Sequence, residues 1–118
     1  MTGVTSISTG YDTTFARLTD GTVWNWGNNY LGEGGQPTAG PFKYATQILN
    51  LGGSAFTANE VSGSLYTTCA RKKDGTVWCW GLGYQGERGD GTNTLEVDYP
   101  VQVKQGTGNL TNIVAISV

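Results

Sequence analysis

Few side chains in this sequence could take part in chemistry. The chain has no histidine, two cysteines, seven basic and nine acidic residues. Without histidine, a serine or cysteine nucleophile lacks the base of the usual catalytic triad. No pair of carboxylates is marked by its spacing for acid–base catalysis. We therefore expect no catalytic residue and no cofactor, and the chain is predicted not to be an enzyme.

The two cysteines, Cys69 and Cys79, flank the turn signal Asp74-Gly75. A hairpin with a two-residue turn would point the cysteines to opposite faces of the sheet. A three-residue loop, with Gly75 in a left-handed bulge, would place them directly opposite each other. We favour the three-residue loop and expect a structural disulfide in an oxidising compartment, with two buried thiols as the alternative. Metal binding is not expected, because there is neither histidine nor a second cysteine pair.

Four other patterns could suggest a site. Gly81 to Gly86 matches the dinucleotide fingerprint in form, but no helical pattern follows, so a loop is predicted. An acidic cluster could offer oxygen ligands to calcium, but its spacing does not fit an EF-hand, and a turn is favoured. Asn109 begins a glycosylation sequon. A basic run at a hairpin tip is predicted to be solvated, with a partner contact as the alternative. The acidic cluster is Glu87, Asp90, Glu96 and Asp98, and the basic run is Arg71-Lys72-Lys73.

The elements that position these residues come from an internal repeat. Residues 13–27 return as residues 67–81, with 11 of 15 positions identical and Asp20 matched by Asp74, 54 positions later. A period of about 50 residues is typical of solenoids, propellers and arrays, in which one unit cannot bury its apolar face alone. Function is therefore expected at the level of an assembly of repeats.

The sequence predicts an all-β fold, because short Val, Ile, Thr and Trp-rich runs alternate with Gly, Asn, Asp and Pro. The three-residue loops set each hairpin so that a large indole faces a small residue, which gives an even surface for sheet packing. The predicted pairs are Ala16–Trp24, Thr14–Trp26, Ala70–Trp78 and Thr68–Trp80. Further strands are expected at 4–9, 46–49, 55–62, 97–103 and 113–118.

The repeated segments resemble the regulator of chromosome condensation repeat. The pattern runs through Gly63–Gly81, Gly86–Thr92, Pro100–Val103 and Ile113–Ser117, and in the first repeat through Gly10–Gly27 and Gly32–Gly35. Its repeat positions are Asp20, Gly21, Trp24, Trp26 and Gly27, matched by Asp74, Gly75, Trp78, Trp80 and Gly81. This resemblance implies a β-propeller, typically of seven four-stranded blades. We expect two four-stranded antiparallel blades, at 1–59 and 60–112, and the start of a third at 113–118.

The chain departs from the family where Gly-Gln-Leu-Gly becomes Gly32-Glu33-Gly34-Gly35 and Gly86-Glu87-Arg88-Gly89. Loss of the apolar leucine in both repeats predicts altered packing of the blades there.

Two blades alone would leave apolar faces open. The chain is therefore expected to be part of a longer propeller or a subunit of a self-assembling ring, in which three or four copies would give six or eight blades. The predicted function is a non-enzymatic structural or protein-interaction module. Alternatives are a protein-binding regulator, such as an inhibitor or exchange factor, and a carbohydrate-binding propeller that uses Tyr30 and Tyr84.

The composition indicates which classes of partner and which cellular locations to expect. The net charge of −2 provides no basic surface for nucleic acid or anionic lipid. No apolar run approaches the roughly 20 residues that span a bilayer. The expected partners are therefore further copies, another protein or a carbohydrate. The sparse charge and the glycine, threonine and aromatic content favour an extracellular, cell-surface or virion location over the cytoplasm.

Overall fold

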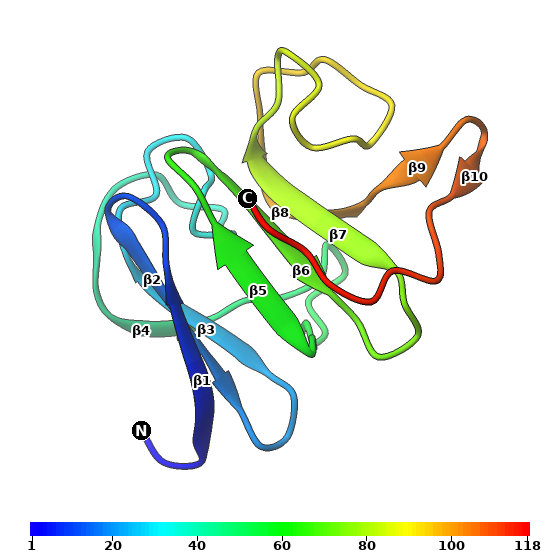
Figure 1. Ribbon diagram of the computed structural model, residues 1–118. Helices are drawn as coiled ribbons and strands as arrows, with labels where there is room; N and C mark the ends of the chain where they lie inside the picture. The colour runs from blue at the N-terminus through cyan, green and yellow to red at the C-terminus, as the bar shows by residue number, and fades with distance from the viewer.

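The computed structural model describes all residues, 1–118, as two four-stranded antiparallel sheets and a small hairpin (Figure 1). The first blade has the order β1-β2-β3-β4, the second β5-β6-β7-β8, and β9 pairs with β10. The strands are β1 (Val4–Thr9), β2 (Thr13–Leu18), β3 (Val23–Gly27), β4 (Phe42–Gln47), β5 (Glu60–Gly63), β6 (Thr67–Arg71), β7 (Val77–Leu82), β8 (Glu96–Gln102), β9 (Lys104–Gln105) and β10 (Gly108–Asn109). The all-β prediction is confirmed. The structure holds no helix with the length and hydropathy that crossing a bilayer requires.

The central hairpin of each blade has the predicted three-residue loop. The Leu18 N–H donates to the Thr22 carbonyl at 3.0 Å, and the Lys72 N–H donates to the Thr76 carbonyl at 2.9 Å. Gly75 has a φ of +83°, which is the left-handed bulge that the loop requires. The register therefore places each indole opposite its predicted small partner, at Ala16–Trp24, Thr14–Trp26, Ala70–Trp78 and Thr68–Trp80.

The glycine after each Trp-x-Trp has a steric reason. Gly81 has a φ of +92°, and a Cβ there would lie 2.2 Å from the Tyr66 carbonyl oxygen. A Cβ on Gly27 would likewise lie 2.3 Å from the Asp12 carbonyl oxygen. The pairing of the third strand with the fourth shifts register just before this glycine in both blades. Glycine is required because no side chain fits against the crossing backbone.

The outer strands differ in part from the sequence predictions. β1 has the expected bounds, and β8 begins one residue early. Only residues 46 and 47 of the expected strand 46–49 lie in β4, which starts at Phe42 and ends at Gln47. Only residues 60–62 of the expected strand 55–62 belong to β5, which continues to Gly63 and pairs with β6. The residues before them pass between the blades and make isolated bridges. Residues 113–118 form no strand, since no second strand lies beside them to complete a ladder.

The main hydrophobic core lies between the two blades. It combines residues from β2, β3, β6 and β7 with the connection that leads from β4 to β5. The fully buried members include Phe15 and Val23 of the first blade and Trp80 of the second. The blades therefore pack face to face and share one core.

Candidate functional site: the faces between blades

Each repeat motif builds a short chain of hydrogen bonds at its hairpin. A carboxylate oxygen of Asp74 accepts from the Thr76 hydroxyl at 2.6 Å and from the Thr76 N–H at 3.0 Å. The same hydroxyl oxygen accepts from the indole N–H of Trp78 at 3.0 Å. The first repeat makes the same three bonds among Asp20, Thr22 and Trp24. The motif positions Asp, Thr and Trp thus fix one indole across the base of the hairpin.

These hydrogen bonds lower the pKa of both aspartates. The Thr76 hydroxyl, followed by its backbone N–H, holds the pKa of Asp74 below its ordinary value of 3.8. Thr22 lowers the pKa of Asp20 for the same reason. Both aspartates are therefore ionised acceptors at neutral pH, although sequence reasoning had identified the motif without assigning this role to the threonines.

The other indole of the second blade joins the two blades. Trp80 is fully buried, and its ring meets Phe15 of the first blade edge to face, with 6.3 Å between centroids. Phe56 lies on the same ring at 5.6 Å, again edge to face. Aromatic pairs with this geometry stabilise by about 0.5–1.5 kcal/mol beyond the area they bury.

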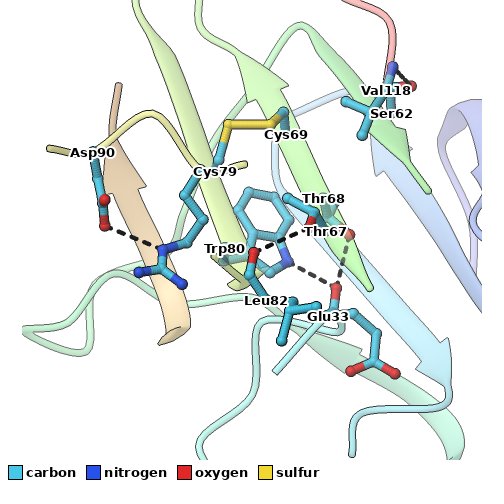
Figure 2. The surroundings of a disulfide bond; sticks show 11 residues. Glu33, Ser62, Thr67, Thr68, Cys69, Cys79, Trp80, Leu82, Asp90 and Val118 are labelled. Carbon is cyan, nitrogen blue, oxygen red and sulfur yellow. Dashed lines mark hydrogen bonds and ion pairs between the residues drawn. A yellow bond between two sulfur atoms is a disulfide. The ribbon is translucent and has the colours of Figure 1, made fainter. Parts of the chain in front are cut away.

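A single backbone carbonyl receives two side-chain donors across this contact. The Glu33 carbonyl oxygen accepts from the Thr68 hydroxyl at 2.8 Å and from the Trp80 indole N–H at 3.0 Å (Figure 2). Glu33 belongs to the loop after β3, whereas both donors stand on the second blade. The repeat positions Thr68 and Trp80 thus provide these two hydrogen bonds between the blades.

The same groups recur, without partners, on the two outward faces of the pair. In the second blade the Glu87 carbonyl corresponds to that of Glu33, and it accepts no hydrogen bond within the chain. In the first blade Thr14 and Trp26 correspond to Thr68 and Trp80. The Thr14 hydroxyl and the Trp26 indole N–H make no hydrogen bond within the chain, and both residues are half-buried. The chain therefore carries one complete blade-to-blade contact and both halves of a second.

The disulfide lies on the open face of the second blade. Cys69 and Cys79 are directly opposite in the register and are joined by an S–S bond of 2.07 Å (Figure 2). The first repeat has Phe15 and Asn25 at these positions, on the face that packs against the second blade. Figure 2 shows the disulfide on the side of the sheet away from the Trp80 ring. The disulfide thus belongs to a surface that is a buried contact in the first blade.

Removal of the disulfide is expected to destabilise the second blade without preventing folding. The double variant Cys69→Ala/Cys79→Ala should lose about 2–3 kcal/mol of unfolding free energy, since the bridge closes only a short loop. The first repeat forms the same hairpin with other residues, so the variant should fold. Urea unfolding of the oxidised chain, the thiol-reduced chain and the variant would test this. Equal midpoints for all three would contradict it.

Arg88 occupies the position of the missing leucine and is buried, with 1% exposure. Its guanidinium donates to the carbonyl oxygens of Gly81 at 2.9 Å and Thr94 at 3.1 Å, and it pairs with Asp90 at 3.1 Å. In the first repeat Gly34 takes this position, and Asn29 fills the loop from the other end by bonding three backbone groups. The packing thus differs from the family pattern as expected. In place of the apolar leucine, a buried polar side chain, Asn29 in the first repeat and Arg88 in the second, holds the loop by hydrogen bonds.

The basic run at the second hairpin is not simply solvated, as the sequence had suggested. The Lys72 ammonium lies 4.4 Å from the centroid of Trp78 and 4.8 Å from that of Phe56. Burial lowers the pKa of Lys72, partly opposed by Asp74. The run thus includes a cation–π contact at the base of the blade interface.

The remaining candidate residues lie apart from the blade interface. The segment from Gly81 to Gly86 is a strand end and a turn, closed by the Gly86 N–H on the Gly83 carbonyl at 3.0 Å, and no helix follows. Asp90 accepts from Thr92 and Arg88. No three acidic side chains gather as for a metal ion. Tyr30 and Tyr84 occupy equivalent loop positions with exposures of 62% and 50%, and Asn109 is exposed in β10.

The geometry of two packed four-stranded blades has counterparts among solved propeller structures. Human WBSCR16 matches with a TM-score of 0.74 and 20% identity, over 90% of this chain and 27% of that protein. Yeast RCC1 (Prp20), solved with Kap60 bound, matches with a TM-score of 0.65 and 20% identity, over 88% and 25%. Prp20p from Saccharomyces cerevisiae also matches with a TM-score of 0.65, at 19% identity, over 88% and 26%. The chain spans about a quarter of each of these proteins.

The sequence comparisons agree with these structures. No curated protein sequence matches the chain. One model of the regulator of chromosome condensation (RCC1) repeat matches residues 4–33 and 60–87, and a second matches residues 74–118. Together they match residues 4–33 of the first blade and residues 60–118. The chain belongs to the regulator of chromosome condensation repeat family and has the fold of β-propeller blades.

Proposed function

We propose that this chain is a non-enzymatic protein-interaction module whose two blades, residues 1–59 and 60–112, are completed by further blades of the same kind. Residues 113–118 then correspond to the first strand of another repeat. The further blades belong either to a longer propeller or to other copies in a ring. Function would come from the assembled propeller and its loops, on a rigid scaffold.

The observation that supports this proposal is the pair of matching open faces. One face presents the Glu87 carbonyl beside the disulfide, and the other presents the free donors of Thr14 and Trp26. Between the two blades, the equivalent groups meet across a buried core. Exposed apolar faces of this kind mark interaction surfaces.

The native mass of the chain and its binding of a hydrophobic dye test the proposal together. A discrete trimer or tetramer by light scattering or native mass spectrometry would identify a ring subunit. A monomer that binds the dye strongly would identify blades whose open faces await a longer propeller. A monomer that binds no dye would contradict the proposal, because its faces would not be available to another protein.

Two alternatives make different predictions. A protein-binding regulator is supported by the likeness to yeast RCC1, which was solved with Kap60 bound. It would capture one partner at fixed stoichiometry in a pull-down. A carbohydrate-binding propeller is supported by Tyr30 and Tyr84, which are exposed at equivalent loop positions. In that case Tyr30→Ala and Tyr84→Ala would each reduce binding to a glycan array, whereas the exposed Tyr44→Ala would not.

A further inference from the structure

The outward face of the second blade holds a groove that the last residues of the chain help to line. The groove has a volume of about 370 Å³ and is lined by the disulfide, Val77 and Val103. Residues 113–118, which we call the strap, run alongside β6 and β7 (Figure 1) and line one side of the groove. The side chains of Ile113 and Ile116 pack on the disulfide and Val77 and stay half-buried.

Only a few polar contacts hold the strap. The Ile113 N–H donates to the Gly75 carbonyl at 3.0 Å, and the Val118 N–H donates to the Ser62 hydroxyl at 3.2 Å (Figure 2). No strand pairs with the strap. The strap therefore rests on the second blade mainly through two apolar side chains.

The contact between the two blades shows which segment occupies the equivalent groove of the first blade. The Ala58 N–H donates to the Gly21 carbonyl at 2.9 Å, which is the bond that Ile113 makes to Gly75 one repeat later. Ala58 and Val61 then pack into the shared core. The strap thus sits on the second blade as the segment leading into β5 sits on the first.

A second segment of the chain has the same pattern and is exposed. In β1, Val4 and Ile7 are the repeat equivalents of Ile113 and Ile116, and they are 41% and 63% exposed. Ser8 follows Ile7 just as Ser117 follows Ile116. Unlike the strap, β1 is paired with β2 and belongs to a complete blade.

We propose that the first blade of a second copy docks on this groove, and that its β1 displaces the strap. This inference rests on the proposed function and names its partner. The Thr14 hydroxyl and the Trp26 indole N–H of the incoming copy would then donate to the Glu87 carbonyl. They would repeat the two bonds that Thr68 and Trp80 make to Glu33. The contact is head to tail, so repeated docking builds a ring or a filament.

The strap sets the strength of docking, because the groove must be vacated before another copy binds. Apparent affinity falls by the fraction of molecules whose groove is open. Equivalent substitutions in the two competing segments are therefore expected to have opposite effects.

The experiment measures the dissociation constant of self-association in the 118-residue chain by sedimentation over a dilution series. Ile7→Ser is expected to weaken association about tenfold, because it removes an apolar side chain that docking buries. Ile116→Ser is expected to strengthen association about fivefold, because it loosens the strap. Trp26→Phe is expected to weaken association about tenfold by removing a donor. The control is Tyr30→Phe, which removes a donor from an exposed loop aromatic outside the docking contact and should leave association unchanged.

Each contrary result has a separate meaning. Association that is insensitive to Ile7→Ser and Trp26→Phe would overturn the docking mode. Equal weakening by Ile7→Ser and Ile116→Ser would show that the strap is part of the contact rather than its competitor, and would also overturn the proposal. If Ile116→Ser stays monomeric at high concentration, self-docking is wrong. Dye binding by that monomer would still leave the proposed interaction module standing.

Discussion

Replacing Trp80 by alanine is expected to lower the free energy of unfolding by about 3–5 kcal/mol. The side chain is fully buried and has aromatic contacts with Phe15 of the first blade and with Phe56. Its truncation leaves a cavity in the only extensive core that the two blades share. It also removes one of the two donors to the Glu33 carbonyl. Because these contacts join the blades, their loss should also reduce the cooperativity of unfolding.

Urea unfolding followed by tryptophan fluorescence and by circular dichroism would measure both effects. The matched control is Trp26→Ala, at the equivalent position of the first blade, where the ring is half-buried and faces no second blade. We expect Trp26→Ala to cost less than about 2 kcal/mol in the monomeric chain. Equal costs for the two variants would show that the packing of Trp80 against the first blade does not provide the stability.

Replacing Arg88 by alanine is expected to cost about 3–5 kcal/mol, the range for breaking a buried ion pair by removing one partner. The substitution leaves Asp90 buried and charged, with 7% exposure. It also removes the donors to the Gly81 and Thr94 carbonyls, which tie the loop after β7 to the strand. The loop should therefore lose order as well as stability, and its amide hydrogens should exchange faster.

The control for this prediction is Arg71→Ala. Arg71 makes an ion pair of similar length with Glu60, 3.1 Å, but both side chains are partly exposed. Exposed pairs contribute about 0–1 kcal/mol. The double variant Arg88→Ala/Asp90→Ala should cost less than the sum of its single variants, because the second change removes the stranded charge. Additive costs would contradict a coupled buried pair.

The pH dependence of stability gives an independent check on Asp90. Burial alone would raise its pKa, but hydrogen bonds from Thr92 and Arg88 outweigh burial and hold the pKa below the ordinary 3.8. A carboxyl group with a lowered pKa in the folded state stabilises the protein above its unfolded pKa. This stabilisation is lost as the pH falls through the folded value.

The difference in unfolding free energy between the wild type and Asp90→Asn is therefore expected to be constant from pH 7 to about 5. It should shrink below about pH 4. Asp20 and Asp74 also have lowered pKa values, so the wild type alone would show a composite acid dependence. Comparison with Asp90→Asn removes their contribution. A difference that is unchanged down to pH 2 would contradict the assignment.

The sequence by itself determined the local architecture of each repeat. The Asp-Gly turn and the need to bring Cys69 opposite Cys79 were enough to select the three-residue loop, and that loop set the pairing of every residue in the hairpin. The small partners of the four tryptophans followed from the same register. Such features are predictable because turn geometry and the two-residue period of a strand act over short sequence distances. The repeat itself identified the propeller blades.

Only the tertiary structure decided which groups meet across the blades. Trp80 and the Glu33 carbonyl are 47 residues apart in sequence, and a backbone carbonyl carries no sequence signal of its role. The burial of Arg88 depends on Gly83, which leaves room for the guanidinium; a Cβ there would overlap it. Lys72 is half-buried because Phe56, in the connection between β4 and β5, packs against its ammonium group. These contacts depend on how remote segments pack, and the period of a repeat does not encode that packing.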